Sequence, residues 1–128
     1  KHENDYQPQL RAMIENGLRV DAINYSKAKE RRIKFVRDME ILTEQVDVLI
    51  TPSTPTPALA DLSNTGNTIF QGPWTYCGLP AITIPSGLSS SGLPLGIQMI
   101  GPKLAEAKLL QIARWCEHIL DLNLSPPL

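Results

Sequence analysis

The side chains most often used for catalysis are sparse in this chain. Its two histidines, His2 and His118, stand near opposite ends, and neither belongs to a motif that would build a Ser-His-Asp or Cys-His site. A metal centre needs three or four converging ligands, and the sequence shows no such cluster. The serine run 89–91, followed by Gly92, is typical of a turn between strands. We therefore expect no catalytic residue, no metal and no cofactor within these 128 residues.

The segment 60–76 is where the chain could bind a small molecule. Residues 60–71 are polar and rich in turn formers, and loops carry specificity more often than cores do. Trp74 and Tyr76 follow at once, and each joins a large apolar ring to one polar group, which suits the wall of a pocket. A second interpretation stays open, in which these two aromatic side chains belong to the hydrophobic core.

Two apolar runs follow this segment and predict strands over 81–85 and 95–100. Both are rich in Ile and Leu and are bounded by Gly and Pro. Because neither alternates cleanly between apolar and polar residues, we expect both inside a sheet that helices cover. Gly96, inside the second run, predicts a bulge or the close approach of another backbone. A further strand is predicted over 46–51, where Pro52 ends it.

Three amphipathic helices are predicted, over 6–16, 18–45 and 104–120. Each has an apolar face, and in the run 18–45 apolar residues recur at three- and four-residue steps while charged residues fill the opposite face, as in a helix that lies on a sheet. Arg32 falls where the apolar face of the longest helix should continue. A buried arginine needs an acceptor, so we predict that Asp47 or a cluster of backbone carbonyls is its partner.

The composition narrows the class of protein. A length of 128 residues with 42% hydrophobic residues corresponds to one domain at most. A net charge of -1 argues against a nucleic-acid or membrane-surface partner, since both need a basic patch. Two cysteines are too few for a disulfide scaffold and predict reduced thiols in a cytoplasmic protein. The start has no apolar signal region and no Met, which fits a mature end or a fragment.

Spaced Gly and Pro residues between 73 and 102 resemble the C-terminal region of the amidase signature family. Family members carry a Gly-x-Pro-Ala turn, a strand ending in Pro-x-Gly, and then Gly-Leu-Pro-x-Gly-x-Gln-x-x-Gly. The matching positions are Gly78, Pro80, Ala81, Pro85, Gly87, Gly92, Leu93, Pro94, Gly96, Gln98 and Gly101. Upstream, residues 47–55 are similar to the family's Asp-x-Leu-x-x-Pro-x-x-Pro, and the resemblance covers roughly residues 6–118.

The resemblance implies an α/β fold, in which residues 1–128 are the C-terminal part of an α/β/α domain with a mixed β-sheet covered by helices. Family members hydrolyse a carboxylic amide to an acid and ammonia or an amine through a serine acyl-enzyme. Their Ser-Ser-Lys triad lies in a Gly/Ser-rich region of the N-terminal half, and no such region occurs here. The chain alone is therefore expected to be inactive, with the N-terminal part of the same amidase as its partner and a small amide as substrate.

The resemblance also bears on the binding segment. Members that act on small amides carry a Thr-Gly-x-x-x-Phe-x-x-x-Trp pattern, which Thr65, Gly66, Phe70 and Trp74 match. The implied substrate-binding residues are Thr65, Thr68, Trp74 and Tyr76.

Two other functions stay open. The first is the amidase subunit of a tRNA-dependent amidotransferase. Those subunits tend to carry an Asp before the Gly-x-Pro turn, where this chain has Thr68, so the sequence disfavours it. The second is a non-catalytic interaction module derived from an amidase. A homodimer is compatible with each of these interpretations.

Overall fold

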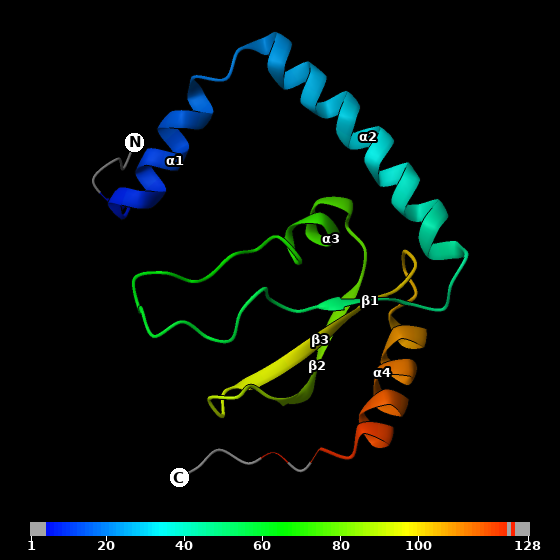
Figure 1. Cartoon of the computed structure of the whole chain (residues 1–128). Helices are drawn as coiled ribbons and strands as arrows, with labels where there is room; N and C mark the ends of the chain where they lie inside the picture. The colour runs from blue at the N-terminus through cyan, green and yellow to red at the C-terminus, as the bar shows by residue number, and fades with distance from the viewer. Residues whose placement is uncertain (1–4, 123, 125–128) are drawn as a thin grey trace. The chain divides into compact units, whose positions relative to one another are not determined.

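The computed structural model describes residues 5–122 and 124, and its strands are interspersed with helices along the chain (Figure 1). The chain divides into two units, residues 1–34 and 35–128. In chain order the elements are α1 (Pro8–Leu18), α2 (Ala22–Glu44), β1 (Leu49–Pro52), α3 (Gly72–Cys77), β2 (Ala81–Leu88), β3 (Pro94–Ile100) and α4 (Glu106–Leu120).

The first unit holds α1 and the first part of α2. Pro8 opens α1, where a proline costs no hydrogen bond because the first helical N–H groups have no acceptor within the helix. The helix continues through Gly17, at which the sequence predicted a stop. It is capped by the backbone N–H of Arg19, which donates to the Asn16 carbonyl, and by that of Val20, which donates to the Gly17 carbonyl, each at 3.2 Å. Asp21 then starts α2 by accepting the backbone N–H of Asn24 at 2.8 Å, which lowers the pKa of the Asp21 carboxyl.

The second unit is built on a three-stranded antiparallel sheet of order β1-β3-β2. In the register, Ile100 of β3 lies opposite Leu49 on one side and Ala81 on the other. The central strand β3 is therefore bonded along both edges. The pairs among these described strands are all antiparallel.

Strand β2 runs through Pro85 to Leu88, past the end that the sequence predicted at residue 85. The N–H of Gly101 donates to the carbonyl of Pro80 at 3.0 Å. Because every second residue of an antiparallel strand bonds to a given neighbour, the residues of β2 at even steps from Pro80 bond to β3. By this alternation Pro85 faces the outer edge of the sheet, where its missing N–H breaks no bond to β3. A bulge between Pro85 and Gly87 then restores the pairing.

Helices cover both faces of the sheet, in agreement with the α/β class. On one face, Ile84 and Met99 pack against Leu109 and Ala113 of α4. On the other, Cys77, Leu79 and Ile100 form a second buried cluster. The partly buried residues packed against that cluster are Phe35, Val36, Met39, Leu49 and Trp74. The end of α2 and the short α3 therefore lie on the face opposite to α4.

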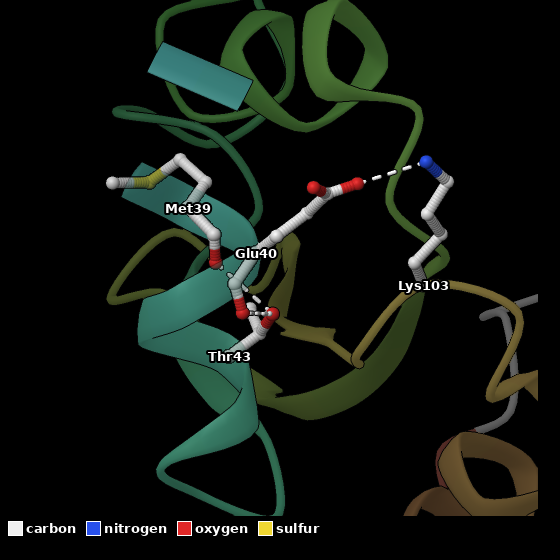
Figure 2. Close-up of polar contacts among 4 residues, drawn as sticks. All are labelled: Met39, Glu40, Thr43 and Lys103. Carbon is white, nitrogen blue, oxygen red and sulfur yellow. Dashed lines mark hydrogen bonds and ion pairs between the residues drawn. The ribbon is translucent and has the colours of Figure 1, made fainter. Parts of the chain in front are cut away.

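The last turns of α2 are held by polar contacts (Figure 2). The buried Thr43 hydroxyl donates toward the carbonyls of Met39 and Glu40, each at 3.0 Å. The Glu40 carboxylate accepts from Lys103 Nζ at 2.8 Å, which ties α2 to the segment before α4. This last contact joins residues 63 positions apart.

The buried arginine expected in the longest helix is not observed. Arg32 is exposed in the structure, and Asp47 accepts from Lys108 Nζ of α4 at 2.8 Å. This contact lowers the pKa of Asp47 through the hydrogen bond and charge of Lys108. An arginine can leave a helix face for solvent because its long side chain reaches water easily.

Gly96 marks the place where two side chains meet over the central strand. Ser53 Oγ and Thr83 Oγ1 lie 3.2 Å apart, and a Cβ on Gly96 would come within 3.0 Å of Ser53 Oγ and 2.9 Å of Thr83 Cγ2. The sequence predicted a bulge at Gly96 or the close approach of another backbone; the structure instead brings two side chains close to Gly96 and places the bulge on the partner strand. A residue with a side chain at 96 would break this contact.

We expect Gly96→Ala to destabilise the protein by about 1–3 kcal/mol, because the added methyl overpacks a rigid part of the sheet. Gly72→Ala is the matched control, since a Cβ there meets nothing within 4 Å. Urea unfolding of the intact protein measures both. Equal stability of the two variants would show that the side chains around Gly96 can shift to accommodate the added methyl group.

The Asp47–Lys108 pair gives a pH-dependent prediction. The pKa of Asp47 is lower in the folded than in the unfolded chain, so the pair stabilises at neutral pH and this contribution is lost as the pH falls through the folded value. Lys108→Ala should return the pKa of Asp47 toward its ordinary value, as followed by NMR titration of the carboxyl carbon. Lys103→Ala, which removes the partner of Glu40, should leave the pKa of Asp47 where it is.

Candidate binding segment around α3

The loop before α3 is shaped by short-range bonds from acidic and amide side chains. Asp61 accepts from the backbone N–H of Ser63 at 2.9 Å and from its hydroxyl at 2.7 Å. Both bonds lower the pKa of the Asp61 carboxyl, and the bond from the Ser63 hydroxyl has the larger effect. Asn64 and Asn67 accept in the same way from the N–H groups of Gly66 and Ile69, each at 2.9 Å. Such turns explain why the loop takes a defined course without strands.

A cavity of about 440 Å³ opens inside this loop. Its walls come from residues 54–67, among them Thr56, Asp61 and Thr65. Of the four residues predicted to bind substrate, Thr65 lines this cavity, whereas Thr68, Trp74 and Tyr76 do not. The four residues therefore lie one after another along the chain, from the loop into α3, and do not line a single cavity together.

Thr68 lies in the turn that leads into α3. Its carbonyl accepts from the N–H groups of Gln71 and Gly72 at 3.0 and 2.8 Å, and its side chain is exposed. The main chain of Thr68 is thus part of the helix start. This leaves the side chain available for a contact outside the described residues.

Trp74 and Tyr76 lie on α3, a helix that the sequence analysis missed. Signals for it were present: Pro73 stands in the first turn, and Gly78 ends the helix with a φ of 72° in the left-handed region. The Gly-Leu-Pro turn of the family pattern is therefore also a helix cap, closed by bonds from the N–H groups of Gly78 and Leu79 to the Trp74 carbonyl.

The two aromatic residues differ in their surroundings. Trp74 is half-buried against the second core cluster, and its Nε1 is buried with no hydrogen-bond acceptor among the described residues. Tyr76 is 43% exposed, and its ring lies 6.1 Å from that of Phe35 at an interplanar angle of 45°. Trp74 thus packs with the core, its role in a pocket stays a prediction, and Tyr76 presents one side to solvent.

The remaining reactive side chains have structural surroundings. Ser89 and Ser91 join through their hydroxyls at 2.9 Å, and Ser89 Oγ accepts from the N–H of Leu93, which confirms the predicted turn between β2 and β3. Cys77 is buried, Cys116 is partly buried, and both carry thiols. His118 lies in the last turn of α4, and His2 lies outside the described residues.

Within the part of the chain that the structure describes, no group of three His, Cys, Asp or Glu side chains is placed to hold a metal ion. Among the same residues, no helix is both long enough and apolar enough to cross a membrane.

The sequence matches the Amidase family over residues 1–110. The chain belongs to this family. It is 40% identical over 110 residues to a glutamyl-tRNA(Gln) amidotransferase subunit of Synechococcus sp., and 43% identical over 107 residues to the corresponding subunit of Bartonella henselae. These alignments cover 80% and 76% of this chain but only 22% and 21% of the relatives. The amidase chain thus spans about a fifth of their length.

Solved structures agree with the family. A crystal structure of an amidase matches 92% of this chain with a TM-score of 0.79 and 25% identity, over 30% of its own length. A glutamyl-tRNA(Gln) amidotransferase subunit of Thermotoga maritima matches 85% of this chain with a TM-score of 0.66 and 30% identity, over 24% of its length. A 6-aminohexanoate cyclic dimer hydrolase in complex with its substrate matches 94%, with a TM-score of 0.73, 25% identity and 29% of its length covered.

The contact between Phe35 and Tyr76 can be tested by a double-mutant cycle. We expect Phe35→Leu and Tyr76→Leu to be coupled by about 0.5–1.5 kcal/mol in unfolding free energy, as is usual for aromatic pairs. Phe35→Leu combined with Trp115→Leu is the control, because Trp115 is on α4 and 63% exposed. That second pair should be additive within about 0.5 kcal/mol. A coupling near zero for the first pair would mean that Phe35 does not position Tyr76.

Proposed function

We propose that the intact protein is an amide hydrolase that converts a carboxylic amide to an acid and ammonia or an amine. The observation that carries this proposal is the Amidase family match over residues 1–110, together with the fold shared with solved amide hydrolases. In this proposal the Ser-Ser-Lys triad lies outside residues 1–128, and this chain supplies one wall of the substrate pocket.

The reaction would run through a covalent serine ester. The serine oxygen attacks the amide carbonyl carbon, the C–N bond breaks, and the nitrogen leaves with a proton as ammonia or an amine. Water then adds to the ester, releases the acid and returns the proton to the serine. No cofactor enters this balance. The hydroxyls of Thr65 and Thr68 would bind polar groups of the substrate, and the rings of Trp74 and Tyr76 would contact its apolar part.

A second candidate is the amidase subunit of a tRNA-dependent amidotransferase. The names of the curated relatives, which are 36–43% identical to this chain, favour it. Both candidates break the same kind of C–N bond and differ in where the ammonia goes. Thr68 argues for the free hydrolase, because the resemblance places an Asp at this position in the amidotransferase subunits.

The partner that we propose is the remaining polypeptide of the same amidase, in the cytoplasm. The outer edge of β2 presents the backbone N–H and carbonyl groups of Ala81 and Thr83, which bond to no described strand. A cavity of about 430 Å³ beside this edge is lined by residues of β2 and α4, which include the apolar Ile82, Leu110 and Ala113 and the charged Arg114 and Glu117. Apolar surface next to an unpaired strand edge is what a further part of the domain would cover.

The experiment is an ammonia-release assay on the intact protein with a panel of small aliphatic and aromatic amides. In parallel, glutamine is supplied with a glutamylated tRNA. We expect hydrolysis of an amide from the panel, no tRNA-dependent transfer, and no activity of residues 1–128 alone. Transfer that depends on tRNA would establish the amidotransferase instead, and no turnover in either assay would favour the non-catalytic module.

The position of the nucleophile is tested with a sulfonyl fluoride, which labels activated serines. We expect the labelled peptide to lie outside residues 1–128, and Ser89→Ala to be inactivated at the wild-type rate. A label on residues 89–91 would overturn the assignment of the nucleophile.

A further inference from the structure

Gln98 is a polar side chain placed where the core would favour an apolar one. It stands on the central strand β3 and is 5% exposed. Its neighbours in the strand, Ile97 and Met99, point to the other face and are apolar. Burying an amide costs free energy unless it is hydrogen-bonded, so the contact that Gln98 makes is informative.

The amide of Gln98 bonds to the main chain of the candidate binding segment. Its Nε2 donates to the carbonyl of Phe70 at 2.9 Å, across 28 positions of sequence. Phe70 belongs to the turn in which the Thr68 carbonyl accepts from Gln71 and Gly72. A side chain on the rigid centre of the sheet is thus bonded to the point where the loop becomes α3.

That point separates the four predicted substrate contacts into two pairs. Thr65 and Thr68 precede Phe70 on the loop, and Trp74 and Tyr76 follow it on α3. Turns within the loop are closed by bonds between residues two positions apart, which do not attach the loop to the sheet. The Gln98 bond is long-range, so it can fix both pairs relative to the sheet. Catalysis is sensitive to such placement, because an error of about 1 Å can cost roughly a hundredfold in rate.

We infer that Gln98 is a positioning residue, which holds the junction at Phe70 and thereby sets the geometry of the substrate wall. This inference rests on the proposed amide hydrolysis. Gln98 acts through Phe70 and does not touch the substrate. Its loss should therefore weaken substrate binding more than it slows the chemical step.

The test compares Gln98→Met with Thr51→Val in the intact protein. Gln98→Met keeps an apolar chain of similar length and removes the donor. Thr51 lies opposite Gln98 on the neighbouring strand β1, and its buried hydroxyl bonds to no described residue. Thr51→Val therefore changes a side chain next to Gln98 and leaves the bond to Phe70 in place. We expect Gln98→Met to lower kcat/KM roughly ten- to a hundredfold, mostly through KM, and Thr51→Val to stay within about threefold of wild type. Wild-type kinetics in Gln98→Met would overturn the inference.

Hydrogen exchange gives a second readout, which does not need activity. In Gln98→Met the amides of Gln71 and Gly72 should exchange at least about tenfold faster than in wild type, with α4 unchanged. If that variant fails to fold, the wild-type protein decides: these two amides should exchange more slowly than those of Ser63 and Gly66, whose acceptors are exposed side chains. Equal rates would overturn the inference.

The two proposals fail in different ways. A wild-type protein that hydrolyses no amide contradicts the proposed function. The hydrogen-exchange rates then still test whether Gln98 holds the junction at Phe70. An active wild type with an unaffected Gln98→Met contradicts only the inference about Gln98.

Discussion

The double-sided pairing of β3 is the constraint on which the rest of this structure depends. Its residues bond to β1 along one edge and to β2 along the other, so its register decides which side chains face which helices. A slip by one residue would exchange Met99, which is fully buried beside α4, with the amide of Gln98. That exchange would put a polar group into one core and remove the contact to Phe70 from the other face.

The two faces of the sheet have different chemistry, and this difference separates stability from binding. The face toward α4 is apolar throughout the cluster of Ile84, Met99, Leu109 and Ala113. The other face mixes an apolar end around Ile100 with the polar side chains of Ser53, Thr83 and Gln98. Polar groups in a core need specific partners, and here they bond to each other or to the loop before α3. The candidate binding segment is therefore attached to the sheet by directional bonds.

Which parts of the site can be predicted from the sequence depends on how far apart along the chain the interacting residues lie. The turns of the loop depend on side chains two residues from their partners, such as Asn64 and Gly66, and polar turn formers indicate them directly. The helix α3 was missed because six residues are too few to show a helical period, although Pro73 and Gly78 signalled its ends. The exposure of Arg32 was missed because a local pattern cannot tell whether a long charged side chain turns to solvent.

By itself, the sequence determined the family, the α/β class, the strand-forming runs around the two Gly-Leu-Pro segments and the turn at residues 89–91. Those properties depend on residue types at fixed local spacings, on which turns, caps and strand ends rely. Only the tertiary structure decided that Ser53 and Thr83 meet over Gly96, that Asp47 pairs with Lys108, and that Gln98 bonds to Phe70. These contacts join positions 28 to 61 residues apart, taking the sequence separations of the three pairs. No local pattern encodes such pairs, because they exist only once the register of the sheet has brought the two segments together.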